Sequence, residues 1–318
     1  MHLTLKHGFI FLPVFTLMLC SSCEPCSSGS DAEIAQCLRT TPKEDIQQDQ
    51  EVRSYLSRHK VYISLTTSPT RISKILPVLQ ALDTEYVENI FLALPDRYRN
   101  SENYVIPAEL DQFPKLKILR TPTDLGPIMK LLPAVLAVKS DPDAIVLTVD
   151  DDTGYPFGMV GQLIKATIKQ GAASTTLGTN IDLWGIDRYG RWPEKIPALP
   201  DCYSGAEISF CDVVQGYAAA AYKTRWIDAK LMVQLGELDI SCKMSDDLVI
   251  SFALALQHIP RVSVFNKFAS HPIGFSYNSG ADALHLGSGS QRTSSASSTN
   301  APRYQKCIEI MHNWTISN

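Results

Sequence analysis

Blocks of apolar residues with strand-like and helix-like spacing alternate along most of this chain. Short runs rich in β-branched and apolar residues predict strands at 61–65, 90–94, 116–120 and 145–149. Apolar positions with helical spacing predict helices ending near 82 and over 128–138, 158–170 and 246–258. Strands that alternate with helices are typical of a mostly parallel sheet with helices on both faces. The pattern therefore predicts an α/β fold.

The start of the chain has a different pattern. Lys6 and His7 precede an apolar run over 9–19, which small residues and cysteines follow, and this is the layout of a signal sequence. The run is shorter than a membrane span of ~20 residues, so residues 1–26 are interpreted as a signal peptide or a signal-anchor. A lipoprotein lipidated at Cys20 or Cys23 is the alternative.

Two further segments lie outside the alternating pattern. Residues 27–58 are charged and Gln-rich without a steady period, which predicts a linker or a peripheral helix. Residues 286–299 are rich in Ser and Gly, and 286–318 are predicted as a loop and C-terminal tail. One folded domain over 59–285 remains, and a chain of 318 residues is long enough for such a domain with a full core.

Charge and cysteine content narrow the picture further. The 29 basic and 33 acidic residues give a net charge of −4, and this balance speaks against a nucleic-acid partner. Three of the eight cysteines lie in or beside the N-terminal segment, and the spacing of the other five matches no zinc site: Cys37, Cys202, Cys211, Cys242 and Cys307. Cys202 and Cys211 are candidates for a disulfide in an extracytoplasmic protein, although unpaired buried cysteines fit equally well. The sequon at Asn313 suits a lumenal location.

Three consecutive aspartates, Asp150, Asp151 and Asp152, follow the strand at 145–149. Two carboxylates ~5 Å apart repel by roughly 3 kcal/mol at an effective dielectric constant near 20. A divalent cation, a basic side chain, or water around an exposed turn would compensate their charge. Ligands of parallel sheets collect at the carboxyl ends of the strands, which places the loop at 66–71 and the aspartates at the same edge.

Four segments in order resemble the nucleotide-diphospho-sugar glycosyltransferases of the GT-A fold, and in particular the inverting, glycosyltransferase family 2-like members. The segments are "VYISLTTSPTRI", "DLGPIMKLLPAV", "IVLTVDDDTGYP" and "MSDDLVIS", and the resemblance covers about residues 60–276. It implies a Rossmann-like sheet. It also implies metal-dependent transfer of a sugar, with inversion, from a nucleotide-diphosphate donor to the hydroxyl of a glycan, lipid or protein acceptor.

By this resemblance, Asp150 and Asp152 form the Asp-x-Asp motif that holds the donor diphosphate through Mn²⁺ or Mg²⁺. Hard cations of this kind take carboxylate oxygens. Asp152 is the expected direct ligand, with Asp150 toward the ribose or a metal-bound water and Asp151 beside them. The resemblance adds His271 as a further ligand, and His285 is a weaker choice. The alternative is an acidic surface turn.

The loop after the first strand is expected to bind the nucleotide. By resemblance, Thr66, Ser68 and Arg71 contact the base and ribose, and Lys130 reaches the diphosphate or the base. The alternative for the loop is a turn that caps the next helix, and the two roles are compatible. The alternative for Lys130 is a solvated helix lysine.

The second acidic pair, Asp246 and Asp247, stands at the start of a predicted helix. The resemblance implies that one of them, preferably Asp247, is the general base for the acceptor hydroxyl. A helix N-terminus lowers the pKa of a carboxyl group, so burial or the neighbouring aspartate must raise it again for useful basicity. The alternative is that both are ordinary helix-start residues.

Aromatic residues are candidates for contact with the acceptor sugar, or else for the core: Trp184, Trp192, Tyr189 and Tyr217. Two other functions remain open. An inactive or carbohydrate-binding relative would keep the sheet and lose turnover. A haloacid-dehalogenase-like phosphatase also has Asp-x-Asp after a strand, but there the motif usually opens the domain, whereas three strands are predicted before it here.

Location is predicted from the N-terminal segment and the donor together. Nucleotide sugars are found in the cytosol and the Golgi lumen, so an exported glycosyltransferase suits a secretory pathway. We therefore expect a lumenal or extracytoplasmic protein that is associated with a membrane through its N-terminus. Lys6 before the apolar run and Glu24, Asp31 and Glu33 after it fit an N-terminus-in orientation.

Overall fold

A computed structural model describes residues 26, 28–99, 102–194, 207–264, 273–276 and 297–318. Within them an eight-stranded sheet has the order β3-β2-β1-β4-β10-β6-β11-β8. The strands of this sheet are β1 (Val61–Leu65), β2 (Asn89–Pro95), β3 (Leu116–Thr121), β4 (Ile145–Thr148), β6 (Ala173–Thr175), β8 (Ile208–Phe210), β10 (Ala220–Lys223) and β11 (Arg261–Val264).

The sheet is mostly parallel, as the sequence predicted. Strands β3, β2, β1 and β4 are parallel neighbours, and β6 and β11 form another parallel pair. Only β10 and β8 run against the neighbours with which they pair in the described sheet. Four two-residue strands form small ladders beside it, β12 with β5 and β7 with β9: β5 (Thr153–Gly154), β7 (Gly178–Thr179), β9 (Val213–Val214) and β12 (Ile273–Gly274).

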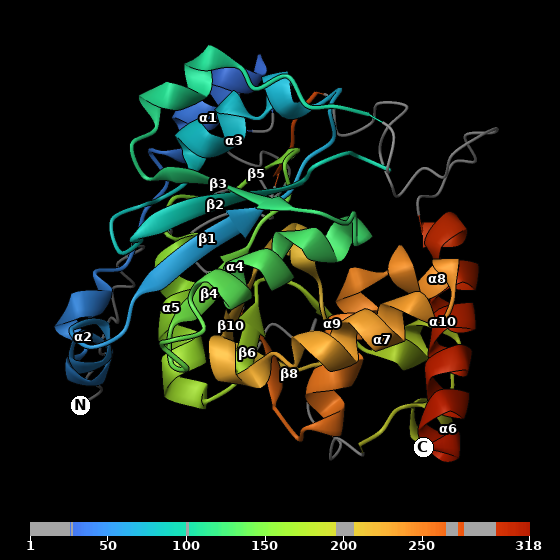
Figure 1. Cartoon of the computed structure of the whole chain (residues 1–318). Coiled ribbons are helices and arrows are strands. Elements are labelled where there is room, and N and C mark those ends of the chain that lie inside the picture. The colour runs from blue at the N-terminus through green and yellow to red at the C-terminus, as the bar shows by residue number, and fades with distance from the viewer. Residues whose placement is uncertain (1–25, 27, 100–101, 195–206, 265–272, 277–296) are drawn as a thin grey trace, which may run out of the picture.

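Helices cover both faces of the sheet, which confirms the predicted α/β architecture (Figure 1). The α-helices are α1 (Asp31–Leu38), α2 (Gln50–Leu56), α3 (Leu76–Ala81), α4 (Leu132–Ala137), α5 (Met159–Gln170), α6 (Arg188–Arg191), α7 (Ala229–Glu237), α8 (Ile240–Lys243), α9 (Asp246–Leu256) and α10 (Ser297–Ser317). Shorter 3₁₀ helices are η1 (Ile46–Gln48), η2 (Ile72–Lys74), η3 (Ala108–Gln112), η4 (Gly126–Lys130), η5 (Ile181–Trp184), η6 (Gly216–Ala218) and η7 (Thr224–Trp226).

Successive apolar side chains of the central strands point to opposite faces of the sheet, so the core has two layers. In β4, Val146 packs with α4, α7 and α9, whereas Ile145 and Leu147 pack with α5 on the opposite face. Strand β10 alternates in the same way, with Tyr222 on the first face and Ala221 on the second. Successive side chains of a strand point to opposite faces, so strands buried on both sides read as the continuous apolar runs seen in the sequence.

The segment at 27–58, expected as a linker or a peripheral helix, is helical and packed on the domain. Helix α1 begins with a capping box between Ser30 and Glu33. Its residues Ile34 and Leu38 join a small apolar cluster with α3 and Phe275. A disulfide joins Cys26 to Cys37, so a leader that is removed would have to end before Cys26 to leave this bond intact.

The last part of the chain forms α10 in place of the tail that the sequence predicted. A disulfide between Cys242 and Cys307 joins this helix to α8, and Figure 1 shows the two helices side by side. Lys306 adds an ion pair to Asp239 at 3.0 Å. Residues 277–296 and Cys202 lie outside the described residues, so the proposed Cys202–Cys211 pair and the Ser/Gly-rich loop are not described.

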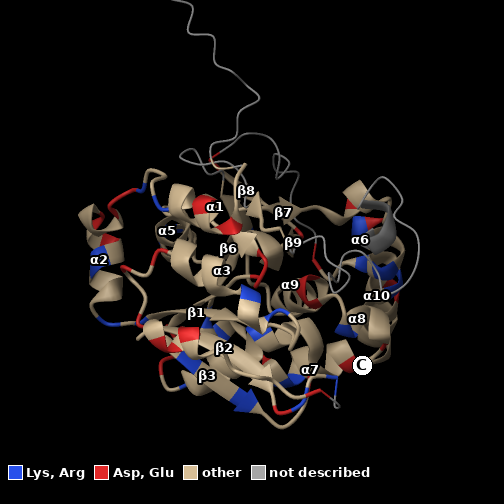
Figure 2. Ribbon diagram, turned by 90° about the horizontal axis from the view of Figure 1, so that it is seen from above, with Lys and Arg blue, Asp and Glu red and all other residues tan. Residues whose placement is uncertain are grey.

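The N-terminal segment at 1–25 also lies outside the described residues. In the part of the chain that the structure describes, no helix has both the length and the apolar character needed to cross a bilayer. Asn313 is exposed on α10. Figure 2 shows Lys and Arg interspersed with Asp and Glu over the ribbon rather than gathered on one side of this view.

The topology marks one place on the sheet as a natural binding edge. From β1 the chain moves outward to β2 and β3, then returns to the other side of β1 as β4. The loops that follow β1 and β4 therefore diverge at a topological switch point, where open α/β sheets bind their ligands. These are the loops that contain Arg71 and the three aspartates.

Candidate functional site

The first of the three aspartates is held by a buried tyrosine. The backbone N–H of Asp150 donates to Tyr155 Oη at 2.8 Å, and Tyr155 Oη donates to the carbonyl oxygen of Tyr217 at 2.9 Å. Tyr155 is buried. A single hydroxyl thus ties the acidic loop after β4 to the turn before β10.

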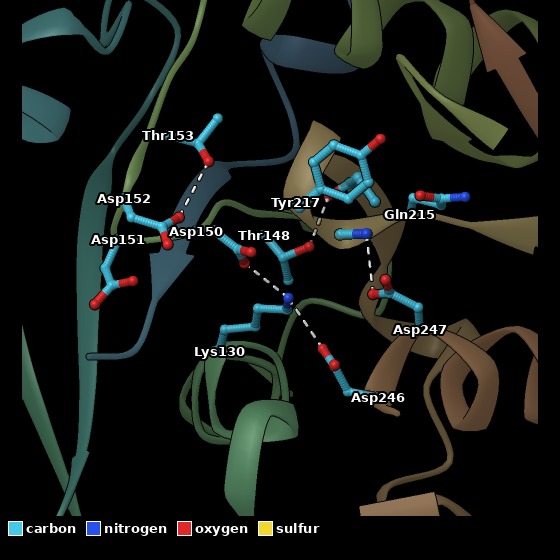
Figure 3. A network of polar contacts seen from close by, with 12 residues as sticks. Lys130, Thr148, Asp150, Asp151, Asp152, Thr153, Gln215, Tyr217, Asp246 and Asp247 are labelled. Atoms are coloured by element: carbon cyan, nitrogen blue, oxygen red, sulfur yellow. Dashed lines mark hydrogen bonds and ion pairs between the residues drawn. The ribbon is translucent and has the colours of Figure 1, made fainter. Parts of the chain in front are cut away.

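Asp151 points away from Lys130 in Figure 3, toward the loop after β1. Thr67 Oγ1 donates to one of its carboxylate oxygens, and Arg71 Nη2 lies 2.8 Å from the other. Burial raises the pKa of Asp151 to about 7, although the Arg71 charge counteracts this and Asp152 adds to it. The loop after β1 therefore fixes Asp151 from two sides.

Asp152 shares Arg71 with Asp151 and accepts a hydrogen bond from Thr153 Oγ1 at 3.1 Å. Its backbone oxygen accepts from the N–H of Phe275 at 2.9 Å, next to the ladder between β5 and β12. Burial raises the pKa of Asp152, and repulsion from Asp150 raises it further. The negative charges of Asp150 and Asp152 thus act directly on each other.

Lys130, at the end of η4, connects the two acidic clusters. Its Nζ lies 2.8 Å from Asp150 Oδ1 and 3.0 Å from Asp246 Oδ2 (Figure 3). The residue is only 5% exposed, so it is no solvated helix lysine. Although burial opposes its charge, Asp150, Asp246 and Asp247 raise the pKa of Lys130 well above its usual range. Lys130 therefore joins a carboxylate that follows β4 to one in the first turn of α9.

Asp247, in the first turn of α9, has one oxygen fixed. The N–H of Gly216 donates to Asp247 Oδ1 at 2.9 Å. Burial, followed by repulsion from Asp246, raises the pKa of Asp247 to about 7, with Lys130 acting in the opposite direction. A side chain at position 216 would place its Cβ 2.8 Å from both Asp247 Oδ1 and Lys130 Nζ, so a larger residue would displace both groups.

Two residues expected at the nucleotide, Thr66 and Ser68, form hydrogen bonds within the protein. Thr66 Oγ1 donates to the carbonyl oxygen of Ala93 at 2.7 Å, and Ser68 Oγ lies 3.0 Å from Thr70 Oγ1. Backbone bonds from Arg71 and Ile72 to the Ser68 carbonyl close a turn before η2. The turn is thus closed by its backbone, and no side chain caps η2. Contact of these residues with a nucleotide stays a proposal. Both His271 and His285 lie outside the described residues.

The aromatic residues that were candidates for contact with the acceptor sugar differ in how deeply they are buried. Trp192 is buried and meets Phe252 edge-on with ring centroids 5.4 Å apart, so it belongs to the core. Trp184 packs against Tyr304 of α10 with centroids 4.8 Å apart. Tyr217 is 43% exposed, directly after Gly216. The side chain of Tyr189 is not among those described.

A cavity of about 60 Å³ opens beside Asp246, between η4, α7 and the start of α9. Its wall is formed mainly by apolar residues such as Ile128, Met232 and Val249.

The donor set is compatible with a hard divalent cation. Among the residues that the structure describes, no group of three or more His, Cys, Asp or Glu side chains converges as a metal cage. Mg²⁺, however, is usually bound by one or two carboxylates together with substrate phosphates. Asp150 and Asp152 would supply two such carboxylates, and in the structure they are paired with Lys130 and Arg71 respectively. The five carboxylates of the two clusters share Arg71 and Lys130, which leaves a net negative charge of three when all are ionised.

Three residues of this arrangement escaped the sequence analysis: Thr67, Tyr155 and Gly216. Tyr155 stands in the motif "VDDDTGYP" and Gly216 in the apolar stretch "QGYAAAAY", and the sequence assigned neither residue a role. Their contacts connect positions 62 and 31 residues apart in sequence, which no local pattern reveals. The only local signals were a glycine inside an apolar stretch and a tyrosine close behind the acids.

Comparison of the sequence with models of known protein families gives no match, and comparison with curated proteins gives none either.

Proposed function

We propose that this protein is an inverting glycosyltransferase that moves a sugar from a nucleotide-diphosphate donor to an acceptor hydroxyl. The observation that carries the proposal is the pair of acidic clusters joined by buried Lys130. One cluster follows β4 at the switch point of a mostly parallel sheet. The other begins a helix and contains a carboxyl group with a pKa of about 7. Displacement at a sugar carbon needs these two functions side by side: a site for the leaving diphosphate and a base for the incoming hydroxyl.

The donor would bind at the loops after β1 and β4. Asp150 and Asp152 would hold Mn²⁺ or Mg²⁺, which supplies positive charge to the diphosphate as it leaves. Arg71 keeps Asp151 and Asp152 oriented through its guanidinium group. Thr66, Ser68 and Arg71 border the same edge, where the nucleotide would lie, and Lys130 adds a fixed positive charge near the diphosphate.

Asp247 would act as the general base. The Gly216 N–H holds its Oδ1, which leaves Oδ2 for the proton of the acceptor hydroxyl. As that proton moves to Asp247, the acceptor oxygen forms its bond to the anomeric carbon and the bond to the diphosphate breaks on the opposite face. The configuration is thereby inverted. A pKa of about 7 suits a base that works near neutral pH.

The disulfides support a location for this activity. Cys26–Cys37 and Cys242–Cys307 are bonds of a kind that persists in oxidising compartments. A lumenal or extracytoplasmic glycosyltransferase, associated with a membrane through the N-terminal segment, fits them. Its acceptor would be a glycan, a lipid or a protein.

The test is donor hydrolysis by the purified protein over a panel of nucleotide sugars, with Mn²⁺ and with EDTA. A glycosyltransferase releases nucleoside diphosphate from one or a few donors, and EDTA abolishes the release. A phosphatase would instead cleave p-nitrophenyl phosphate, and a binding protein would cleave neither. Either of these results would overturn the proposal.

A further inference from the structure

A single carboxylate lies at the start of the helix that carries Lys130. Asp124 Oδ1 accepts a hydrogen bond at 2.8 Å from the N–H of Gly126, the first residue of η4. Asp124 Oδ2 accepts a second one at 2.7 Å from the N–H of Arg99, in the loop after β2. Asp124 is only 8% exposed, so both bonds are shielded from water. The carboxylate therefore ties the loop after β2 to the helix that ends at Lys130.

Both N–H groups belong to residues with a left-handed backbone conformation. Arg99 has φ of +48° and Gly126 has φ of +76°. In a residue other than glycine this conformation is strained, and it persists only where the surroundings impose it. At position 126 a Cβ would also lie 3.2 Å from the carbonyl oxygen of Lys243, which favours glycine there. Asp124 thus holds the chain at the two places where its backbone is least usual.

The packing of η4 against α9 is interrupted by the cavity beside Asp246. Ile128 of η4 and Val249 of α9 both belong to the wall of this cavity. A 3₁₀ helix also has poorer hydrogen-bond geometry than an α-helix, so it depends more on contacts with its surroundings. The carbonyl oxygen of Asp124 accepts from Lys243 Nζ at 3.2 Å, which attaches the same residue to α8. Polar contacts of Asp124 therefore contribute strongly to the position of η4.

Lys130 has to be placed accurately to reach both acidic clusters. Its Nζ lies 2.8 Å from Asp150 Oδ1 and 3.0 Å from Asp246 Oδ2, and a displacement of about 1 Å would break such contacts (Figure 3). We propose that Asp124 is the positioning residue for Lys130, because it fixes the start of η4 and thereby the place of the lysine between the clusters. The consequence for turnover rests on the proposed function, whereas the position of the lysine can be measured without it.

The ammonium group of Lys130 provides a readout that needs neither donor nor turnover. Contacts between ionised groups are strong, so a buried ammonium group between two carboxylates exchanges its protons with water slowly. Its proton–nitrogen NMR signal should therefore be visible in the wild type, and loss of the signal in Lys130→Met assigns it. Asp124→Ala removes both acceptor oxygens, whereas Asp124→Asn retains one of them.

Asp124→Ala should move Lys130 away from the carboxylates, so that its signal is lost through exchange with water. Asp124→Asn should shift the signal without abolishing it, because the amide oxygen still accepts from one of the two N–H groups. An unchanged signal in Asp124→Ala would overturn the inference, and so would the lack of a signal from the wild type. If Asp124→Ala does not fold, Asp124→Asn decides, and an unshifted signal there has the same meaning.

Asp49→Ala is the matched control for the loss of two backbone hydrogen bonds. Asp49 accepts from the N–H groups of Glu51 and Val52 at the start of α2. Helix α2 precedes β1, so it lies at the opposite end of that strand from the loop with Arg71. Urea unfolding should show a loss of stability in both alanine variants, and the Lys130 signal should persist in Asp49→Ala. A signal lost in both would mean that Asp124 supports the whole fold rather than Lys130.

Turnover gives a second readout through the pH profile. The charged and titratable groups around Asp247 come from α9, η4, β10, α10 and the loop after β4: Asp246, Lys130, Tyr222, Tyr304 and Asp150. Lys130 is the positive charge that lowers the pKa of Asp247, so its displacement should raise that pKa. A rise of about one unit moves the pH midpoint of turnover up by as much and lowers turnover about tenfold below it, at saturating donor.

The loss of turnover in Asp124→Ala should disappear above the new midpoint, which a general loss of stability would not produce. An equal loss at every pH would contradict the inference. A wild type that transfers and hydrolyses no nucleotide sugar would count against the proposed function alone, because the ammonium signal of Lys130 in the two Asp124 variants and in Asp49→Ala then decides the role of Asp124.

Discussion

At the scale of single residues, the question raised by three adjacent aspartates has a physical answer in basic side chains. Lys130 neutralises Asp150, and Arg71 serves Asp151 and Asp152. The negative charge is only partly neutralised, because the positive charge of Lys130 also interacts with Asp246 and Asp247. Burial raises the pKa values of Asp151, Asp152 and Asp247, and repulsion between neighbouring carboxylates raises them further. A bound divalent cation would relieve this excess of negative charge.

Asp152→Asn should abolish Mn²⁺-dependent binding of a nucleoside diphosphate while the fold survives. The change removes an anionic ligand and also its repulsion with Asp150, and Arg71 retains Asp151 as a partner. Stability without metal should therefore equal or exceed that of wild type. Calorimetry with Mn²⁺ and the diphosphate measures the first effect, and urea unfolding the second.

Asp151→Asn is the matched control, because Asp151 points toward Thr67 and Arg71 rather than Lys130. It should retain most of the metal-dependent binding. Equal losses in the two variants would contradict the assignment of Asp152 as the ligand.

Asp247→Asn should keep the donor affinity near wild type and lower turnover by ~10²–10⁴-fold. Asp246→Asn should show the smaller defect, since Asp246 faces Lys130.

A base acts only when ionised, so wild-type turnover should rise with pH and level off above about 7. NMR of the product should show an inverted anomer. Retention, or a loss of less than about fivefold in both variants, would remove this pair from the mechanism.

At the scale of elements, the sequence predicted the first four strands of the eight-stranded sheet and the helices near α3, α4, α5 and α9, because each has its own apolar period. It missed the four short strands of the second half, β6, β8, β10 and β11. The strand predicted at 61–65 coincides with β1, and that at 145–149 differs from β4 by one residue. Both acidic clusters were also placed at element ends from sequence alone. The ion pairs of Arg71 and Lys130 with the aspartates were not predicted. The partners are far apart in the sequence, and only the tertiary structure brings them together. Helix α10 was missed because Pro302 and a preceding Ser-rich run suggest a tail.

Tyr155→Phe tests the link between the acidic loop after β4 and the turn at 215–219 that precedes β10. It leaves the N–H of Asp150 and the carbonyl of Tyr217 without their shared partner, which should lower the free energy of unfolding by about 1–3 kcal/mol. Turnover should fall as well, because both clusters lose a common anchor. Urea unfolding and donor hydrolysis measure the two effects.

Tyr55→Phe is the matched control for this experiment. Tyr55 Oη donates to the Asp143 carbonyl just before β4, at the opposite end of that strand from the aspartates. The control should lose stability and keep its turnover. If turnover falls equally in both variants, the hydroxyl of Tyr155 has no special role at the site.

At the scale of the whole molecule, the two disulfides constrain the first and the last helix of the described chain. Cys26–Cys37 joins the residues before α1 to the last turn of α1, and α1 packs on α3. Cys242–Cys307 fastens α10 to α8, four residues before Asp246. Trp184 and Tyr304 continue this contact between α10 and the domain. The C-terminal helix therefore supports the segment from which α9 and its acidic pair begin.

Loss of the Cys242–Cys307 disulfide should destabilise the protein more than loss of Cys26–Cys37. The bonds span 65 and 11 residues, for which chain entropy gives about 4 and about 3 kcal/mol. The Cys242→Ala, Cys307→Ala double variant should lower the free energy of unfolding by about 4 kcal/mol and expose α10 to protease. It should also reduce turnover, because α8 immediately precedes the proposed base. The Cys26→Ala, Cys37→Ala pair is the matched control and should keep turnover near wild type. Equal turnover in both double variants would mean that α10 gives no support to the acidic pair.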